Sequence, residues 1–118
     1  MHIMVVDDDI DAATTIAMLL ELYGHTVWVE HSAEKALISA RAVLPQTLLL
    51  DIGLPGMNGF ELAKQLRAMP EMSKALMVAM TAYSRLQDRK KSREAGFDHF
   101  LEKPVDIQTL LALLEPNN

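Results

Sequence analysis

The sequence predicts an α/β protein in which helices cover both faces of a parallel β-sheet. Three observations predict this class. Short apolar runs of strand length alternate five times with helical patterns, cap signatures precede the helices, and glycine or proline follows them. The 118 residues suit one domain, which we place over residues 1–118.

The first two strand–helix units occupy the chain as far as Val43. His2 to Val6 is an apolar run, and Asp9 is suited to cap the helix that follows it. Residues 26–30 alternate apolar and polar side chains, and Ser32 suits the start of a helix to about Val43. We assign the apolar stripe of the first helix to Ala12, Ile16, Leu19, Leu20 and Tyr23.

The third unit contains the most informative stretch of the chain. Residues 47–51 include three consecutive leucines, as expected of a strand that is buried on both faces. Asn58, followed three residues later by Glu61, is a cap signature for a helix to about Ala68. Residues 70–73 then read as a loop.

The fourth and fifth units complete the pattern. Residues 76–80 form another continuously apolar strand, and Ser84 suits the cap of a helix to about Glu94. That helix has only two apolar side chains, so we expect it to pack weakly. Residues 97–101 alternate like an edge strand, and Asp106 suits the cap of the last helix.

The strand patterns also predict the order of the sheet. The first, third and fourth strands are apolar throughout, which is typical of interior strands, whereas the second and fifth alternate like edges. The order 2-1-3-4-5 places the three apolar strands inside the sheet and the two alternating strands at its edges. This order describes a doubly wound (βα)5 sheet of the flavodoxin-like type. Ligands of such sheets bind at the carboxyl ends of the strands, near the first and third.

Composition narrows the function classes. The net charge of −5 argues against direct nucleic-acid binding, and the lack of cysteine excludes disulfides and thiolate metal sites. With no apolar run near ~20 residues and no signal peptide, we expect a cytoplasmic protein without membrane contact. Basic residues gather between Arg85 and Arg93. We favour a solvated helix face there, and a docking surface for an acidic partner is the alternative.

Five polar residues stand where strands end, and the fold would bring them together. Two carboxylates about 4 Å apart repel by ~4 kcal/mol at an effective dielectric of 20. A group of three therefore needs a cation or must take up protons. If a cation binds, an all-oxygen site without cysteine suits Mg²⁺. A lysine and a hydroxyl complete a site able to stabilise a transferring phosphoryl group. These residues are Asp7, Asp8, Asp51, Thr81 and Lys103.

Each residue alone has an ordinary explanation. Asp8 could cap a helix, Thr81 could belong to a turn, and Lys103 could form a surface ion pair. Asp51 is different, since Asn58 already caps the helix that follows it. The convergence of all five favours a site in which Asp51 is the nucleophile that forms an aspartyl-phosphate.

These residues lie in motifs that carry a family resemblance. The sequence resembles the receiver domain of two-component response regulators over its whole length. The motifs are Val5-Val6-Asp7-Asp8, Leu50-Asp51-Ile52-Gly53-Leu54-Pro55-Gly56-Met57-Asn58-Gly59, Met80-Thr81-Ala82 and Glu102-Lys103-Pro104. The resemblance implies a phosphoacceptor, not a separate catalytic enzyme, in which Asp51 receives a phosphoryl group from a histidine kinase or a histidine phosphotransfer protein.

The resemblance also implies a role for several further residues. It implies that Asp8, Asp51 and the carbonyl of Gly53 bind Mg²⁺, or Mn²⁺ in its place, while Asp7 acts through water. It implies that Lys103 contacts the phosphoryl group and that the peptide bond before Pro104 is cis.

In that family a switch follows phosphorylation. The hydroxyl of Thr81 would move toward the phosphoryl group, and Phe100 would turn inward. The surface of the fourth helix, fifth strand and fifth helix would then act on a downstream protein or an attached output domain. Gly53 and Tyr83 would tune dephosphorylation, which we expect to be slow for the family. We expect a monomer or a weak phosphorylation-dependent dimer.

Three other interpretations fit parts of the sequence. A flavin- or nucleotide-binding domain would need a Ser/Thr/Gly-rich phosphate loop where this chain has three aspartates, residues 7–9. A haloacid-dehalogenase-like phosphatase would need an acid at the position of Gly53. A degenerate receiver that acts only as a protein-binding module would usually lack the acidic pair, the acceptor or the lysine, all of which are present here.

Overall fold

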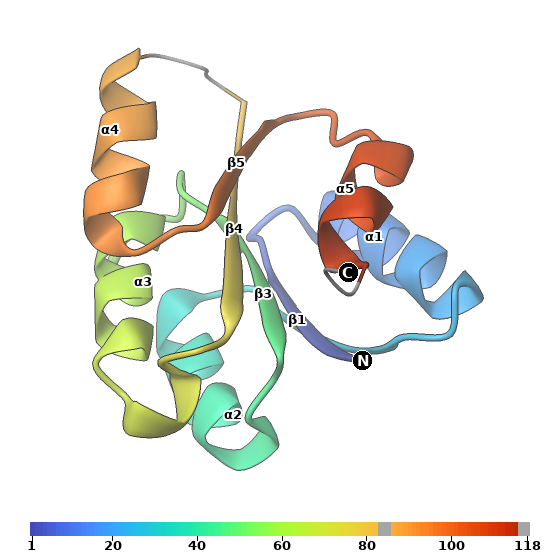
Figure 1. The fold of residues 1–118 in the computed structure, drawn as a ribbon, viewed down its shortest axis with the longest axis horizontal. Helices are drawn as coiled ribbons and strands as arrows, with labels where there is room; N and C mark the ends of the chain where they lie inside the picture. Colours follow the sequence, from blue (N-terminus) through green and yellow to red (C-terminus); the bar gives the residue numbers. More distant parts are fainter. Residues whose placement is uncertain (83–85, 116–118) are drawn as a thin grey trace.

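The computed structural model describes residues 1–82 and 86–115 and has one five-stranded sheet with helices on both sides (Figure 1). The strands are β1 (His2–Val6), β2 (Thr26–Glu30), β3 (Thr47–Asp51), β4 (Leu76–Thr81) and β5 (His99–Glu102). The helices are α1 (Ile10–Leu22), α2 (Ala33–Val43), α3 (Gly59–Arg67), α4 (Leu86–Ala95) and α5 (Ile107–Leu114). A short 3-10 helix, η1 (Pro70–Met72), lies between α3 and β4.

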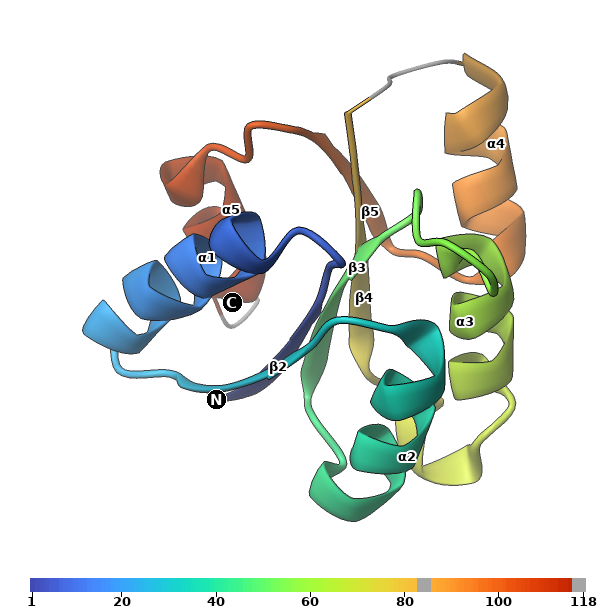
Figure 2. The same cartoon turned by 180° about the vertical axis from the view of Figure 1, so that it is seen from behind.

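The order of the sheet is β2-β1-β3-β4-β5 and every neighbouring pair is parallel, which confirms the predicted flavodoxin-like topology. Helices α2, α3 and α4 lie on one face, and α1 and α5 lie on the other (Figures 1 and 2). Because all five strands run the same way, their carboxyl ends meet at one edge of the sheet.

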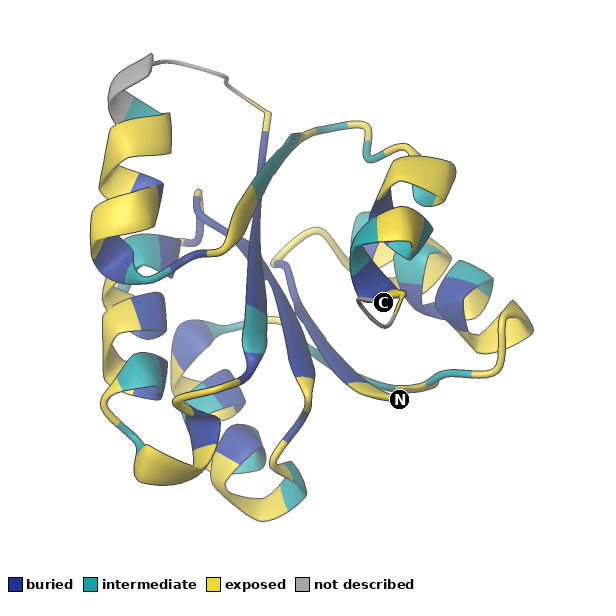
Figure 3. Ribbon diagram, viewed as in Figure 1, coloured by how far each residue is buried: buried dark blue, intermediate teal, exposed yellow. Residues whose placement is uncertain are grey.

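Burial follows the predicted distinction between inner and edge strands. Strands β3 and β4 are buried almost throughout, and β1 is buried after His2 (Figure 3). Strands β2 and β5 are half-buried or exposed along their length, because each has a neighbour on one side only. The edge strands therefore show no clean alternation of buried and exposed residues.

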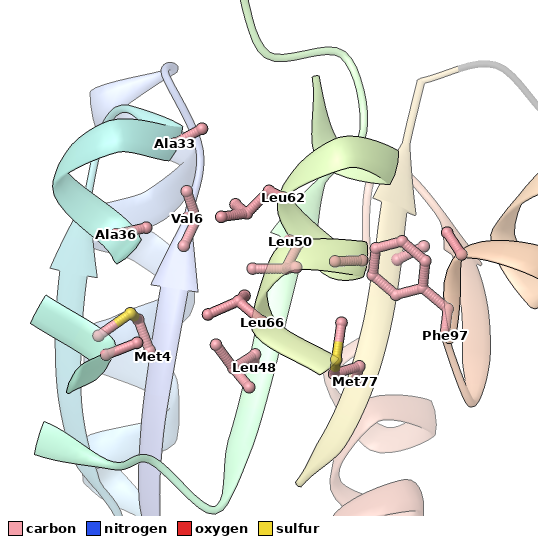
Figure 4. Close-up of a cluster of buried hydrophobic side chains, with 14 of the residues drawn as sticks. Met4, Val6, Ala33, Ala36, Leu48, Leu50, Leu62, Leu66, Met77 and Phe97 are labelled. Atoms are coloured by element: carbon pink, nitrogen blue, oxygen red, sulfur yellow. The ribbon is translucent and has the colours of Figure 1, made fainter. Parts of the chain in front are cut away.

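Side chains of the inner strands alternate between two hydrophobic clusters. The first cluster lies under α2, α3 and α4, and residues from β1, β3 and β4 meet these helices there (Figure 4). The second lies under α1 and α5. In β1, for example, Met4 and Val6 belong to the first cluster, and Ile3 and Val5 to the second. A strand buried on both faces must be apolar at every position, which explains the three leucines of β3.

Four of the predicted helix caps are confirmed. Asp9, Ser32, Asn58 and Asp106 each accept a hydrogen bond from the backbone N–H three residues ahead. These bonds satisfy amides that the helix itself leaves without an acceptor. The fifth predicted cap, Ser84, lies outside the described residues.

Three local expectations were wrong in detail. The buried stripe of α1 consists of Ala13, Ala17 and Leu20, whereas Tyr23 is 55% exposed. Small alanines let α1 lie close to the sheet, and a hydrophobicity pattern undervalues them. β5 begins at His99 and not at residue 97, and residues 70–72 form a turn of 3-10 helix instead of a loop.

One glycine fixes how closely α3 approaches the end of β3. A Cβ atom on Gly59 would lie 2.5 Å from Cα of Ile52 and 2.7 Å from the carbonyl oxygen of Asp51. Both contacts are with backbone, which cannot move aside as a flexible side chain can. The absence of a side chain at this position thus allows the first turn of α3 to pack beside Asp51.

Arg67 joins several segments at the opposite end of the sheet. Its guanidinium donates hydrogen bonds of 2.6–3.2 Å to the backbone carbonyls of Met72, Ser73, Ala75 and Gly96. It also forms a 2.8 Å ion pair with Asp98, whose carboxylate accepts a bond from the backbone of Met77. Arg67 therefore holds the end of α3 against η1, the start of β4 and the turn before β5.

Replacing Arg67 with Met should lower the free energy of unfolding by roughly 2–4 kcal/mol, because several carbonyls lose their donor. Urea unfolding followed by circular dichroism measures this loss. Arg41→Met is the matched control, since Arg41 is an exposed arginine of α2. Equal effects of the two substitutions would contradict the role assigned to Arg67.

Candidate functional site

The carboxyl edge of the sheet brings together the aspartates that the sequence singled out. Asp7 follows β1 directly and Asp51 ends β3, and these two strands are neighbours. Asp7 is fully buried, Asp51 is 7% exposed, and Asp8 is exposed. The site therefore has two carboxylates set into the protein and a third at its solvent-facing side.

Lys103 supplies the positive charge that holds the two buried carboxylates. Its Nζ lies 2.7 Å from Oδ2 of Asp7 and 3.3 Å from Oδ2 of Asp51. The remaining oxygens are bound by backbone, since Oδ1 of Asp7 accepts from the N–H of Asp9 and Oδ1 of Asp51 from that of Gly53. Burial without such partners would cost several kcal/mol for each charge.

The donor set of the site fits a hard divalent cation. Asp7, Asp8 and Asp51 each offer one oxygen, and these oxygens lie within 4.8 Å of one another. With all three carboxylates ionised, the single ammonium of Lys103 leaves two negative charges uncompensated. An all-oxygen group with that charge and an exposed side has the chemistry that Mg²⁺ prefers, because Mg²⁺ keeps several waters.

Burial and neighbouring charges shift the pKa of both groups that face each other, Asp51 and Lys103. It raises the pKa of the Asp51 carboxyl, the neighbouring charge of Asp7 adds to the increase, and the N–H of Gly53 and the ammonium of Lys103 oppose it. Burial alone would lower the pKa of Lys103, but its hydrogen bond to Asp7 and the charge of Asp51 prevail, and its pKa is raised. Lys103 is therefore firmly charged near neutral pH.

Thr81 and Phe100 lie on the α4 side of the sheet. Thr81 ends β4 and is 4% exposed. Ala79 of β4 pairs with Phe100 of β5. Ala79 belongs to the first hydrophobic cluster, and the half-buried Phe100 packs against that cluster. Thr81 stands two residues after Ala79, so the strand alternation gives it the same face. The backbone N–H of Lys103 donates to the carbonyl of Thr81 at 2.7 Å.

The remaining predicted residues take different positions. Gly53 is exposed beside Asp51, and a Cβ atom there would lie 3.5 Å from Oδ1 of Asp51, which is an ordinary contact. The peptide bond between Lys103 and Pro104 is cis. Tyr83 lies outside the described residues.

One neighbour of the site did not emerge from the sequence. Nδ1 of His31 lies 3.0 Å from the backbone carbonyl of Asp7, so a residue after β2 contacts the first acidic strand end. The pairing between β1 and β2 brings His31 to the site, and no motif in the sequence around it marks this contact. The predicted strand order, which already placed the first two strands side by side, is the signal that could have identified it.

Comparison with known proteins places the chain in a family. The model of the response regulator receiver domain matches residues 3–115. The chain therefore belongs to the receiver domains of two-component systems. A relative in Leptolyngbya boryana, an uncharacterized 14.6 kDa protein, is 38% identical, and the match covers 98% of this chain and 88% of the relative.

Solved structures agree with this assignment. The BeF3-activated N-terminal receiver domain of Klebsiella pneumoniae RstA is 30% identical with a TM-score of 0.89, and the match covers 97% of this chain and 95% of that one. A response regulator from Burkholderia pseudomallei, solved with a phosphorylated aspartic acid, a calcium ion and citrate, is 28% identical with a TM-score of 0.90. That match covers 98% of this chain and 67% of the other.

No helix in the described part of the chain has both the length and the apolar character needed to cross a membrane.

The raised pKa of Asp51 predicts how Asp51→Asn changes the thermal stability of the protein when a chelator removes divalent metal ions. A raised pKa means that protonated Asp51 favours the folded state. This contribution to the free energy of unfolding is fully present below the ordinary pKa of the carboxyl, and it is lost as pH rises through the higher pKa of the folded state. The ionised carboxylate is therefore a cost at about pH 7, and Asp51→Asn should raise Tm there more than at about pH 4.

Differential scanning calorimetry at the two pH values measures the difference. Glu71→Gln, which removes an exposed carboxylate on η1, should show no comparable change with pH. A Tm for Asp51→Asn that stays at or below that of the wild type near neutral pH would disprove the prediction.

Proposed function

We propose that this chain is a phosphoacceptor that receives a phosphoryl group on Asp51 in a magnesium-dependent reaction. The observation that carries the proposal is the pairing of a buried Asp51 with Lys103 inside a group of three carboxylates. Further support comes from family membership and from the phosphorylated aspartic acid of the Burkholderia relative.

We assign Mg²⁺, with Mn²⁺ as an alternative, to Asp8, Asp51 and the carbonyl of Gly53, with Asp7 acting through water. When bound, the ion supplies positive charge to the oxygens of the phosphoryl group. Asp8 suits direct binding because it is the exposed member of the group. Asp7 suits a supporting role because Lys103 and the backbone of Asp9 already occupy its oxygens.

The reaction is an in-line displacement at phosphorus. A carboxylate oxygen of Asp51 forms a bond to phosphorus while the N–P bond of a phosphohistidine breaks, and the imidazole leaves with that electron pair. Lys103 already lies 3.3 Å from Asp51, so its ammonium is placed to contact the phosphoryl oxygens as charge develops. The raised pKa of Lys103 keeps that ammonium protonated through the reaction.

The switch would act through the α4 side of the sheet. The Thr81 hydroxyl would move toward the new phosphoryl group, and Phe100 would turn inward. Thr81 and Phe100 share a face of neighbouring strands, so one movement makes room for the other. Phe100 has no hydroxyl, and its rotation therefore needs only an apolar space.

The expected partners follow from this chemistry. The donor is a histidine kinase or a histidine phosphotransfer protein, and the readout is a downstream protein or an attached output domain contacting α4, β5 and α5. The chain promotes its own phosphorylation and dephosphorylation and acts on no separate substrate. We expect a monomer or a weak phosphorylation-dependent dimer, and Leu113 of α5 is half-buried against the second hydrophobic cluster.

Incubation with acetyl phosphate and Mg²⁺ should add the mass of one phosphoryl group to the intact protein. Asp51→Asn and a chelator should each abolish the adduct, and Lys103→Ala should slow its formation by about a hundredfold or more, as expected for loss of a charge-stabilising donor. Intact mass spectrometry over time measures all three.

Glu21→Gln, an exposed carboxylate of α1, is the charge-matched control and should behave as the wild type. An adduct that persists in Asp51→Asn would refute the acceptor. Absence of any adduct in the folded wild type, with phosphohistidine donors also inactive, would favour the degenerate receiver that acts as a binding module.

Replacing Gly53 with Asn should accelerate dephosphorylation several-fold, because an amide at this position could orient the attacking water. The site has room, since a Cβ atom there meets Asp51 at an ordinary distance. Tyr83→Glu is expected to act in the same direction. Loss of the phosphoryl adduct after removal of the donor gives the rates, and Gly53→Ala controls for bulk alone. Rates unchanged by Asn and Glu would show that these positions do not set the lifetime.

A further inference from the structure

A small cavity lies between α4 and β5, on the side of the molecule away from the second hydrophobic cluster. Its volume is about 240 Å³. It is lined by Arg89, Ser92, Arg93, Phe97, Asp98, His99 and Phe100. These residues come from α4, the turn after it and the start of β5, which lie side by side in Figures 1 and 2. None of them belongs to the acidic site.

The α4 wall of this cavity is basic. Arg89 and Arg93 are four residues apart, so they project from the same side of the helix one turn apart. Helix α4 carries four basic residues, Arg89, Lys90, Lys91 and Arg93, against two acidic ones, Asp88 and Glu94. The whole chain has a net charge of −5. This face is therefore a local region of positive charge on an acidic protein.

Ser92 adds a polar group that lacks a partner. It is 1% exposed, and its hydroxyl is the only buried side-chain N or O atom without a hydrogen bond among residues 1–82 and 88–115, whose side chains the structure describes. Leaving a buried hydroxyl unsatisfied costs about 1–3 kcal/mol. Because Ser92 lines the cavity, a rotation of its side chain would offer this donor to a group bound there.

The cavity already shows the kind of contact that it could make with a ligand. The guanidinium of Arg89 lies 5.4 Å from the centre of the Phe100 ring and 3.9 Å from the carboxylate of Glu102. Both contacts are partly exposed and so can be exchanged at low cost. The carboxylate of Asp98 also lines the cavity, but Arg67 and the backbone of Met77 bind it, which limits its repulsion of an anion.

We propose that this cavity binds a carboxylate side chain from an acidic segment of a partner protein. Arg89 and Arg93 would hold the carboxylate, Ser92 would donate to it, and Phe97 and Phe100 would contact an apolar residue beside it. This inference rests on the proposed function for its signalling role, because α4 and β5 form the surface to be switched. The binding itself requires neither magnesium nor phosphorylation.

The size of the cavity favours a side chain over a larger anion. Sites for drug-sized ligands and cofactors usually exceed ~300 Å³, which is more than this cavity provides. A nucleic acid would also meet the acidic remainder of the chain, which repels phosphates. An acidic peptide can place one carboxylate in the cavity and keep its other charges in solvent.

The test is an NMR titration of the whole ¹⁵N-labelled chain with a capped peptide, acetyl-Gly-Glu-Leu-Glu-Gly-amide, in a chelator. We expect amide shifts concentrated between Arg89 and Phe100, and no such shifts with the peptide in which Gln replaces both Glu residues. Shifts spread over the molecule, or no shifts at millimolar Glu peptide, would overturn the proposal. Stronger binding of a short RNA or of anionic lipid vesicles at the same amides would overturn it as well.

Matched variants separate the cavity from general charge. Arg93→Gln and Arg89→Gln should each lower the affinity for the peptide roughly tenfold or more. Lys90→Gln removes an equal charge from an α4 residue outside the cavity and should change the affinity less than about twofold. Equal losses for all three variants would overturn the proposal.

Two further variants complete the test. Ser92→Ala should lower the affinity for the peptide several-fold while leaving Tm unchanged or higher. An unchanged affinity would overturn the role of the hydroxyl. Asp51→Asn should bind the peptide as the wild type does. Failure of phosphorylation with intact peptide binding would therefore reject only the proposed function, and the reverse result would reject only this inference.

Discussion

The ammonium of Lys103 between Asp7 and Asp51 is the interaction on which the rest of the site depends. A parallel sheet collects its strand ends at one edge, and here that edge receives two buried carboxylates and an exposed third. Lys103 follows β5, which is separated from β3 by one strand and from β1 by two, so its contacts with Asp51 and Asp7 fix the end of β5 relative to both. The charge that remains is available for a divalent ion, so the same geometry that makes burial tolerable also leaves the site reactive.

Much of this fold could be predicted because its determinants are local or simply periodic. The caps of Asp9, Ser32, Asn58 and Asp106 depend on a bond to an amide three residues away, so a few letters of sequence suffice. The strand order could be predicted because strands buried on both faces are apolar throughout, whereas edge strands alternate apolar and polar residues in the sequence. The convergence of the site residues then followed from topology alone, since strand ends share one edge.

What the sequence did not reveal depends on contacts between distant residues. Arg67 binds carbonyls in three separate segments, and no local pattern marks an arginine with that role. The contact of His31 with Asp7 exists only because β1 and β2 are neighbours. Small side chains are a second source of error, because the alanines that face the sheet in α1 carry little hydrophobic signal although they set the distance between helix and strand.

The two charged regions are connected by neighbouring strands of one sheet. Asp51 ends β3, Thr81 ends the neighbouring β4, and Phe100 on β5 packs beside Arg89 on α4. Under the proposed function, the Thr81 hydroxyl would move toward the phosphoryl group, and in a close-packed interior that movement would displace neighbouring side chains. Phe100 is half-buried and lies against the partly exposed guanidinium of Arg89, so its ring can move without breaking a buried contact on that side. Since Arg89 also lines the basic cavity, a carboxylate that drew Arg89 from Phe100 would favour the same displacement, and the acidic and basic regions would influence each other through one aromatic ring.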